Sequence, residues 1–583
     1  MIKHLMKSIR EYKKDSILSP LFVTCEVILE VIIPFLMADL IDNGIDAGNM
    51  NYILKIGITL IICALVSLVF GFLSGRSAAI ASAGFAKNLR KDMYDHVQEF
   101  SFSNIDKFST ASIVTRLTTD VTNVQNSYQM IIRVAVRSPI MMICAVVMAF
   151  NVAGSLACIF LACIPILGIG LYFIMTRTHP IFERVFKTYD HLNNIVQENL
   201  HGIRVVKSFV REEHEIDKFK RISQSIYKDF TRAEKNLAYN MPLMQICVYG
   251  SMLFISWFGA RLIVVSGNNP DMGLSTGELM SLFVYLMQIL MSLMMLSMVF
   301  VMITISKASA ERIVELLQET SDITTPADAS TTVADGSIDF ENVSFSYSKN
   351  PDKLCLKSID LHITSGQTIG ILGGTGSGKS SLVQLIPRLY DATSGTVKVG
   401  GIDVRNYDLE ILRDQVAMVL QKNVLFSGTI RENLRWGNPD ASDEELIHAC
   451  KLAQADDFIR SFPKGYDTYI EQGGNNVSGG QKQRLCIARA LLKKPKILIM
   501  DDSTSAVDTH TDALIQNAFR SEIPETTKII IAQRISSIEH ADQIIVMDNG
   551  EINAIGTHET LLNTNSIYQE VYASQKKGGS DNE

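Results

Sequence analysis

The sequence of 583 residues is 47% hydrophobic and only 20% charged, and its mean hydropathy is +0.17. Soluble chains usually carry about 25% charged residues, so this composition excludes a disordered protein and a simple soluble one. The 54 basic and 61 acidic residues leave a net charge of −7, which provides no global basic field for nucleic acid. The nine cysteines follow no metal-site or disulfide spacing. The chain therefore combines a membrane-embedded part with a water-soluble part.

The first half of the chain predicts an all-α transmembrane domain over residues 15–318. Residues 1–14 mix basic and apolar side chains and predict an amphipathic helix lying on the cytoplasmic membrane surface. Each long apolar stretch that follows approaches or exceeds the ~20 residues that a helix needs to cross ~30 Å of hydrocarbon. There are six such stretches, so both ends of the domain lie on one side of the membrane; they cover residues 16–41, 53–73, 131–150, 152–175, 241–265 and 279–305.

Basic residues set the orientation of these spans. Three short loops contain no Lys or Arg, namely 42–52, 151–154 and 266–277. The connections around residues 87–107 and 177–235 are rich in both, so the positive-inside rule makes these connections cytoplasmic. Their apolar residues recur at helical spacing, which predicts helices that continue far beyond the bilayer. We expect each long hairpin to end in a turn, near 102–108 and 202–209, that contacts a cytoplasmic partner.

Charged residues within two spans predict an intramembrane ion pair. Glu26 and Glu30 lie four residues apart on one helix face, as do Arg133 and Arg137. A rise of about 1.5 Å per residue places Glu26 and Arg137 at a similar depth. Isolated charges at that depth are costly, so we expect Glu26 to pair with Arg137. The alternative is that both arginines extend to the cytoplasmic interface and never meet the glutamates.

The second half of the chain predicts an α/β nucleotide-binding domain. Residues 319–336 are polar and indicate a linker, and the domain follows over residues 337–574. Its strand patterns are joined by helical ones, which favours a mainly parallel sheet with some antiparallel strands at one edge. The predicted strands cover residues 337–347, 368–372, 396–399, 416–420, 497–500, 528–532 and 543–547. Residues 575–583 predict a disordered tail.

A phosphate-binding loop follows the predicted strand 368–372. The run GGTGSGKS fits the pattern G-x-x-x-x-G-K-[ST] and precedes a helical run over 381–389. Glycines let successive N–H groups close around phosphate oxygens, and the helix N-terminus adds its dipole. Lys379 is predicted to reach the β- and γ-phosphates and Ser380 to ligate Mg²⁺. The predicted ATP-binding residues here are Gly373, Gly374, Thr375, Gly376, Ser377, Gly378, Lys379, Ser380 and Ser381.

Two further elements fit the same chemistry. Asp501 ends the buried strand 497–500, where a carboxylate can hold Mg²⁺, and Gln421 stands at the end of another strand. The run Val477-Ser478-Gly479-Gly480-Gln481 opens an amphipathic helix and forms a second phosphate-binding helix start. One nucleotide cannot easily use both helix starts within a monomer, which predicts a dimer with nucleotide between the chains.

In order and spacing, these motifs resemble those of the ATP-binding cassette (ABC) transporters, specifically the half-transporter exporters. The resemblance covers essentially the whole chain and implies an ATP- and Mg²⁺-dependent exporter of the cell membrane. It implies that Tyr347 stacks on adenine, and that Ser380, Gln421 and Asp501 surround the metal. The residues implied to act in trans are Ser478, Gly479, Gly480, Gln481 and the loop 505–508, including Asp508. The cytoplasmic turns match the family's coupling helices.

Two positions depart from the family pattern. Asp502 stands where the family has a catalytic glutamate, and Gln533 where it has a histidine. A carboxylate withdrawn by ~1.5 Å can cost ~10²-fold in rate, and an amide cannot become cationic as imidazole can. The pattern resembles the degenerate-site subunit of a heterodimeric exporter, whose partner supplies glutamate and histidine. Val477, where leucine is more usual, is a packing change.

Two other interpretations stay open. One is a homodimeric exporter in which Asp502 serves as the catalytic base, and the other is a membrane protein gated by ATP without pumping. The spans are rich in methionine and aromatic residues, which suits amphiphilic small molecules or lipids as substrates. Ordinary helix packing explains the same residues, and drugs, lipids and peptides stay open as substrate classes.

Overall fold

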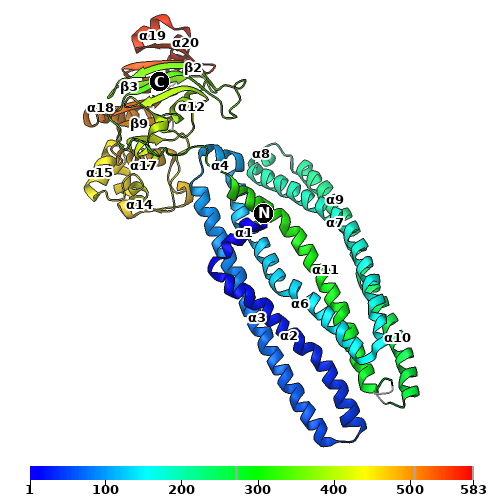
Figure 1. Cartoon of the computed structure of the whole chain (residues 1–583). Coiled ribbons are helices and arrows are strands. Elements are labelled where there is room, and N and C mark those ends of the chain that lie inside the picture. Colours follow the sequence, from blue (N-terminus) through cyan, green and yellow to red (C-terminus); the bar gives the residue numbers. More distant parts are fainter. Residues whose placement is uncertain (269–272, 503–506, 581–583) are drawn as a thin grey trace. The chain divides into compact units, whose positions relative to one another are not determined.

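The computed structural model describes the chain except for residues 269–272, 503–506 and 581–583. Two units are visible in it (Figure 1). A helical unit comprises Met1–Gln98 and Thr110–Glu319. A soluble unit comprises Glu99–Ser109 and Thr320–Glu583, so the short segment around residue 104 belongs with the C-terminal half of the chain.

The helical unit confirms the six predicted spans. Among the described residues, six helices are long and apolar enough to cross a membrane. They are built on α2 (Lys13–Leu40), α3 (Met50–Gln98), α6 (Val121–Ala153), α7 (Cys158–His201), α10 (Asn240–Ser266) and α11 (Thr276–Gln318). Several of these helices are far longer than the ~20 residues of a span, as predicted. The hairpin tips carry short helices: α4 (Phe102–Phe108) and α5 (Thr110–Thr115) at one tip, and α8 (Ile203–Ser208), followed by α9 (Glu212–Leu237), at the other.

The N-terminal segment differs from the single amphipathic helix that the sequence predicted. It consists of α1 (Ile2–Met6) and a 3₁₀ turn (Lys7–Tyr12), and the backbone kinks at Arg10, whose φ is 40°. The segment packs on α3, because Ser8 and Arg10 both bond to Asp92, at 2.7 and 2.6 Å. Polar contacts to α3 thus interrupt a segment that hydrophobic periodicity alone predicts as one continuous helix.

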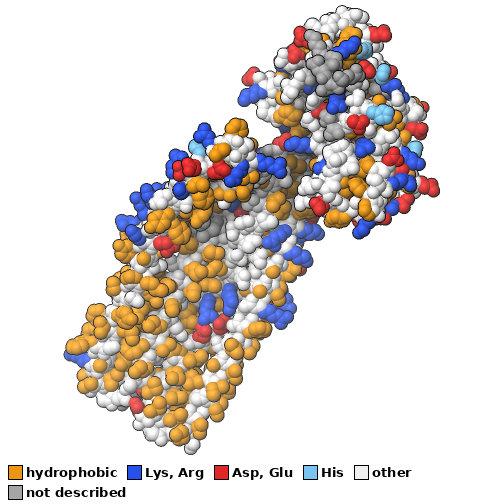
Figure 2. All heavy atoms as spheres, turned by 180° about the vertical axis from the view of Figure 1, so that it is seen from behind, with side chains coloured by type: hydrophobic (Ala, Val, Ile, Leu, Met, Phe, Trp, Pro, Cys, Tyr) orange, Lys and Arg blue, Asp and Glu red, His pale blue; other side chains and the backbone are white. Residues whose placement is uncertain are grey.

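The surface of the helical unit is suited to lipid. Figure 2 shows hydrophobic side chains spread over much of it, with a group of basic and acidic side chains among them partway along the unit. The predicted intramembrane ion pair is confirmed: Arg137 Nη1 lies 2.5 Å from Glu26 Oε1, and Nη2 lies 2.6 Å from Glu30 Oε2. One guanidinium therefore bridges two carboxylates between α2 and α6. Each charge would cost about 2.5–3.5 kcal/mol or more if left alone at that depth.

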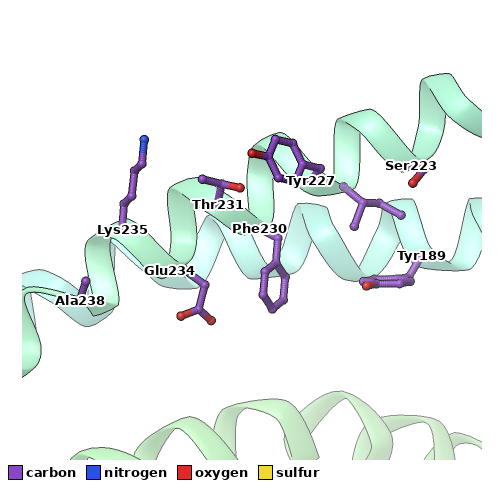
Figure 3. Close-up of a pocket in the computed structure, with 9 residues that line it drawn as sticks. Tyr189, Ser223, Tyr227, Phe230, Thr231, Glu234, Lys235 and Ala238 are labelled. Carbon is purple, nitrogen blue, oxygen red and sulfur yellow. The ribbon is translucent and has the colours of Figure 1, made fainter.

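Helices α7 and α9 continue the fourth and the fifth span beyond their apolar parts. An open groove of about 660 Å³ runs along them and is lined by aromatic and polar side chains. Figure 3 shows Phe230 and Glu234 on one side of this pair, with Tyr227 and Lys235 on the other. The mixture of aromatic and charged side chains agrees with a segment outside the hydrocarbon.

The soluble unit contains two main sheets. The six-stranded sheet has the order β12-β11-β3-β10-β9-β6, parallel except for the edge strand β12. Most of the predicted antiparallel strands do not join this edge but form a separate four-stranded sheet, β2-β1-β4-β5. The strands are β1 (Ile338–Phe345), β2 (Leu356–Ile363), β3 (Thr368–Gly373), β4 (Ser394–Val399), β5 (Ile402–Asp403), β6 (Val416–Val419), β7 (Gly428–Thr429), β8 (Tyr469–Ile470), β9 (Ile497–Asp501), β10 (Thr527–Ile531), β11 (Gln543–Asp548) and β12 (Glu551–Gly556).

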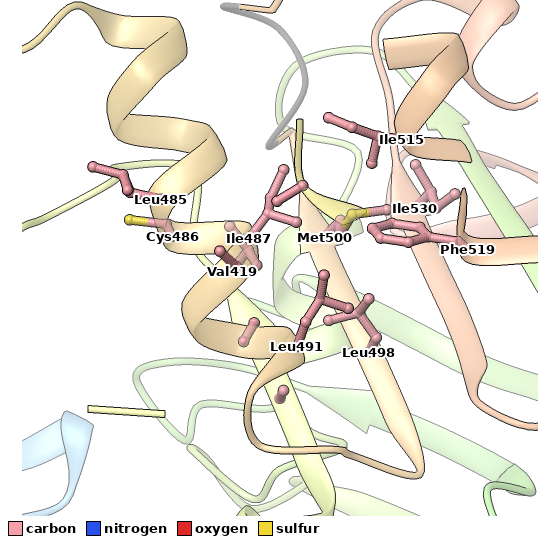
Figure 4. Close-up of a cluster of buried hydrophobic side chains, with 14 of the residues drawn as sticks. Val419, Leu485, Cys486, Ile487, Leu491, Leu498, Met500, Ile515, Phe519 and Ile530 are labelled. Carbon is pink, nitrogen blue, oxygen red and sulfur yellow. The ribbon is translucent and has the colours of Figure 1, made fainter. Parts of the chain in front are cut away.

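A buried apolar cluster fixes the centre of the parallel sheet. Figure 4 shows Ile487 and Leu491 of α17 near Leu498 and Met500 of β9, with Phe519 on the other side. All five side chains are buried. Burying such side chains stabilises by about 1.5–3 kcal/mol each, so the end of β9 is held rigidly. That end carries Asp501.

The remaining helices surround the sheets. They are α12 (Lys379–Gln384), α13 (Leu409–Gln415), α14 (Ile430–Arg435), α15 (Asp443–Leu452), α16 (Asp456–Ser461), α17 (Gly479–Leu491), α18 (Thr509–Glu522), α19 (His558–Thr564) and α20 (Ser566–Ser580). Helix α12 is shorter than the predicted run over 381–389. The predicted disorder from Gln575 is wrong up to Ser580, because α20 extends that far and Gln575 bonds to the backbone of Gln533 and Ile535.

Candidate nucleotide-binding site

The phosphate-binding loop lies between β3 and α12, as predicted. Gly376 and Gly378 have φ of 84° and 95°, a region that favours glycine. A Cβ on Gly373 would lie 2.4 Å from the backbone oxygen of Met547, so this position also has no room for a side chain. The loop therefore needs its glycines to wrap its backbone N–H groups around an anion at the N-terminus of α12.

Lys379, Ser380 and Asp501 meet at the start of this helix. Lys379 Nζ donates to the carbonyls of Gly373 and Gly374, at 2.9 and 2.7 Å. Ser380 Oγ donates to Asp501 Oδ1 at 3.0 Å. Burial raises the pKa of the Asp501 carboxyl, although the hydrogen bond from Ser380 opposes this, and burial lowers the pKa of Lys379. Asp501 is buried and Lys379 is half-buried, so each gains from an ionic ligand of opposite sign.

This donor set fits Mg²⁺ and a nucleotide phosphate. A hydroxyl and a carboxylate are the hard oxygen ligands that Mg²⁺ prefers, and Ser380 and Asp501 already lie within hydrogen-bond distance. Lys379 and the glycine backbone would hold the phosphates. Bound Mg²⁺ would supply charge neutralisation between the phosphates. Gln421, the third predicted metal residue, instead directs its amide to Asp502, at 3.4 Å.

The residue after Asp501 is held by amides. Gln533 Nε2 donates to Asp502 Oδ2 at 2.6 Å, so both departures from the family pattern meet in one hydrogen bond. Asp502 is buried and has φ of 47°, a region that Asp adopts more readily than most residues. The parallel pairing of β10 with β9 explains the encounter, because Asp502 and Gln533 follow neighbouring strand ends.

Tyr347 lies beside the same helix. Its hydroxyl contacts Ser381 Oγ at 3.0 Å, and 46% of the residue is exposed, which leaves ring surface for a base to stack on. The ring packs edge-on against Phe345 and Tyr390, with centroids 4.8 and 5.1 Å away. The predicted adenine-stacking residue is therefore part of an aromatic cluster built from β1 and the segment before β4.

Ser478 and Gln481 form a reciprocal cap on α17. Ser478 Oγ accepts from the backbone N–H of Gln481 at 3.3 Å, and Gln481 Oε1 accepts from that of Ser478 at 3.0 Å. Ser478 and Gly479 are exposed. The cap orders a helix start that faces solvent, as a site acting on another chain requires.

The loop 505–508 is only partly described. Ser505 and Ala506 lie outside the described residues. Asp508 caps α18 by accepting from the backbone N–H of Thr511 at 2.9 Å. Arg534 Nη1 donates to the carbonyl of Val507 at 3.3 Å, which ties this loop to the residue after Gln533.

Two contributors to the site could not be found from the sequence. Gln575 of α20 donates to the carbonyl of Gln533 at 2.8 Å and accepts from the N–H of Ile535 at 2.9 Å. Tyr390 donates to Asp106 Oδ2 at 2.8 Å and so joins the aromatic cluster to α4. Neither residue belongs to a motif, and each acts across a long stretch of sequence.

Comparison with known proteins agrees with these features. The family models described as "ABC transporter transmembrane region" and "ABC transporter" match residues 16–294 and 356–505. The uncharacterized ABC transporter ATP-binding protein YfiB of Bacillus subtilis is 37% identical over 550 residues, 94% of each chain. The putative multidrug export ATP-binding/permease protein YgaD of the same organism is 30% identical over 99% of each chain.

A solved structure has the same fold. It is a bacterial Atm1-family ABC exporter with ATP bound, with a TM-score of 0.82 and 24% sequence identity over 97% of this chain and 99% of that one. In the described part of the chain, six candidate membrane helices precede a nucleotide-binding domain, which makes this a multi-pass membrane protein with that domain in the cytoplasm. The chain therefore belongs to the ABC transporter family, as an exporter half-transporter in which one transmembrane domain is fused to one nucleotide-binding domain.

Proposed function

We propose that this chain is one subunit of a heterodimeric exporter of amphiphilic small molecules or lipids, and that its own ATP site hydrolyses slowly. Its family supplies ATP-driven transport and action as a dimer. Asp502 and Gln533 supply the asymmetry between the two sites. In this proposal the partner chain carries glutamate and histidine at the corresponding positions.

The observation that carries this proposal is the hydrogen bonding of Asp502. Its Oδ2 accepts from Gln533 Nε2 at 2.6 Å, and Gln421 Nε2 lies 3.4 Å from the same oxygen. A general base has to direct a lone pair at the attacking water. Here two amides compete with water for that oxygen, on a side chain already one methylene shorter than glutamate. Slow hydrolysis follows, whereas ATP binding depends on Lys379 and its loop.

The N-terminus of α17 supports the other half of the proposal. Its cap is complete and its serine is exposed, so it can complete an active site on a partner chain. Stabilising donors of this kind supply several kcal/mol of barrier lowering when they are oriented in advance. Loss of this helix start should therefore affect the competent site, and loss of Asp502 the weak one.

A cavity in the helical unit supports an amphiphilic substrate. It has a volume of about 570 Å³ and lies between α7 and α11. Its walls include Leu171, Met175 and Phe300, and His179 and Thr304 also line it. An adaptable apolar wall with a few polar groups suits a molecule that has both characters.

The test compares two variants in the assembled complex. Gly480→Asp should lower ATP hydrolysis about 100-fold, because it places a carboxylate where a phosphate binds. Asp502→Asn, which keeps the size of the side chain, should leave hydrolysis within about twofold of the unchanged complex, because it alters only the slow site. Equal losses would mean equivalent sites and would favour the homodimer with Asp502 as base.

Two further measurements bear on the same point. The purified chain without a partner should bind Mg²⁺-ATP and hydrolyse it poorly, and rapid turnover in that preparation contradicts the heterodimer. Asp502→Glu combined with Gln533→His should raise hydrolysis at this site only in part, since the partner's helix start is expected to be altered. If the double change makes the two ATP sites hydrolyse equally fast, the partner's helix start is not altered.

A further inference from the structure

Near the intramembrane ion pair, two side-chain oxygens and one guanidinium have unused hydrogen-bonding capacity among the described residues. Glu26 is 8% exposed, and among the described residues no donor reaches its Oε2, although Oε1 accepts from Arg137. In the same helical unit, the buried Oε1 of Gln288 also has no donor among the described residues. Arg133 has no carboxylate within ion-pair distance in the residues that the structure describes. These groups are two acceptors and one cationic donor.

Glycines on α3 place Glu26 and Arg133 one helical turn apart. A Cβ on Gly71 would lie 3.1 Å from Glu26 Oε1, and a Cβ on Gly75 would lie 3.5 Å from Arg133 Nη1. Residues four apart share one helix face and are about 6 Å apart along its axis. The carboxylate and the guanidinium therefore lie against successive turns of α3, and the glycines make room for both.

Gln288 reaches the same place from α11. Its Nε2 lies 3.4 Å from the backbone carbonyl of Glu30, one turn along α2 from Glu26. The side chains of Arg137 and Glu30 are 32% and 29% exposed, so the cluster opens on one side. Figure 2 shows basic and acidic side chains together, with hydrophobic side chains around them, on the face of this unit that it draws.

We propose that Glu26, Gln288 and Arg133 bind the zwitterionic group of an amphiphile. A primary ammonium of the ligand donates to Glu26 Oε2 and Gln288 Oε1, and an adjacent phosphate or carboxylate accepts from Arg133. This inference rests on the proposed export of amphiphiles and names the class of their polar group.

The charge balance favours a zwitterion over a simple ion. Glu26 and Glu30 carry two negative charges and Arg133 and Arg137 two positive ones, so the cluster has no net preference for a cation or an anion. A ligand with both charges satisfies both acceptors and the guanidinium at once. Glu26 lies about 22 Å along α2 from Ile41, close to the cytoplasmic side of a ~30 Å core. An amphiphile of the inner leaflet has its polar group on this side of the membrane, about 8 Å or more from this depth, so it has to move that far into the protein to reach the cluster.

Binding can be tested on the full-length protein without nucleotide. Native mass spectrometry would count bound lysophosphatidylethanolamine, which has a primary ammonium beside a phosphate. Lysophosphatidylcholine, whose ammonium has no N–H, and dodecylamine, which has no anion, are the comparisons. We expect at least tenfold tighter binding of the first. Nε-lauroyl-lysine, with a carboxylate in place of the phosphate, decides between a phospholipid and other zwitterions, because only a phosphate-specific site rejects it.

Variants separate the site from a general affinity for detergent-like molecules. Gln288→Leu and Arg133→Leu leave the ion pairs of Arg137 with Glu26 and Glu30 intact and should each weaken lysophosphatidylethanolamine binding at least fivefold. Ser292→Ala, one turn from Gln288 on α11, is the matched control and should not change it. Unchanged binding in both variants, or equal binding of the two lysolipids, overturns the proposal. This binding measurement does not depend on turnover. If binding is tight and selective but a separate assay finds no transport, the proposed export is contradicted and the binding site is not.

Discussion

Each of the two cytoplasmic hairpin tips carries a short helix, but the two helices differ in capping and in burial. Helix α4 begins with a reciprocal cap between Ser101 and Asn104 and buries Asn104 and Phe108. Helix α8 has no side-chain cap and no buried residue, and Val205 and Phe209 near its end are 60% and 72% exposed. One tip is therefore satisfied within its own chain, whereas the other presents apolar groups to solvent. We infer that the partner subunit covers α8, since exposed apolar tips on a dimeric exporter are typical of interfaces.

Helix α4 is held by hydrogen bonds to other segments of its own chain. Asp322 of the linker accepts from Ser101 and Ser103, at 2.5 and 2.8 Å, and Asn104 donates to the carbonyl of Thr320 at 3.2 Å. Tyr390 bonds to Asp106 and also touches the ring of Tyr347. A continuous set of contacts thus joins the expected adenine site to α4, and the comparison with α8 can be tested by breaking each tip.

The largest effect is expected at α8. Phe209→Asp should lower substrate-stimulated ATP hydrolysis of the complex by about 30-fold or more, because an unpaired carboxylate in an apolar interface costs at least ~2 kcal/mol. Phe209→Leu keeps the apolar contact and is the control. Hydrolysis at the original level in the aspartate variant would mean that α8 stays in water.

The next effect concerns the anchor of α4. Burial raises the pKa of Asp322, but hydrogen bonds from Lys349, Ser101 and Ser103 outweigh it and lower this pKa to about 2, from an ordinary 3.8. Asp322→Asn should therefore destabilise the protein by about 1–2 kcal/mol near pH 7.

The pH dependence of this destabilisation has a definite sign. A carboxyl whose pKa is lowered by folding stabilises fully above its ordinary pKa and loses this contribution as the pH falls through its folded value. The difference in melting temperature between Asp322→Asn and the unchanged protein should be largest above about pH 5, fall as the pH is lowered toward 2, and disappear only below about pH 2. A difference that is constant from pH 2 to 7 would show that the carboxylate charge does not anchor α4.

The sequence predicted the parts of this molecule that depend on local pattern. Six apolar stretches, the loop before Lys379 and the strand ending at Asp501 all lie where expected, because hydropathy and glycine spacing act within a few residues. The pairing of Glu26 with Arg137 was also predictable, because the regular rise of two helices places both residues at a similar depth.

What the sequence missed depends on contacts between distant segments. The kink at Arg10 follows from Asp92, more than eighty residues away, and the order around Gln575 follows from the backbone of Gln533. The separate antiparallel sheet was predicted as an edge because β-patterns do not say which strands pair. The bond between Asp502 and Gln533 required the pairing of β9 with β10.

A smaller effect is expected from Tyr390→Phe. The change removes the 2.8 Å hydrogen bond to Asp106 but keeps the ring against Tyr347 and Phe102. Loss of one such bond costs about 1 kcal/mol, so stimulation of ATP hydrolysis by substrate should fall about two- to fivefold. ATP affinity should stay unchanged, as titration with a fluorescent analogue would show. A large loss of affinity would place Tyr390 in the nucleotide site instead of between it and α4.

The smallest effect is expected from Lys349→Met. Lys349 lies 2.8 Å from Asp322, but its side chain is 70% exposed, and ion pairs of this kind contribute about 0–1 kcal/mol. Ser101→Ala, which removes a partly buried hydroxyl and the cap of α4, should cost more, about 1 kcal/mol. Both are measured as shifts in melting temperature, at low and high salt. If Lys349→Met is as costly as Ser101→Ala and its cost falls in high salt, an exposed charge holds α4, and the anchor is then a surface contact as open to water as the tip of α8.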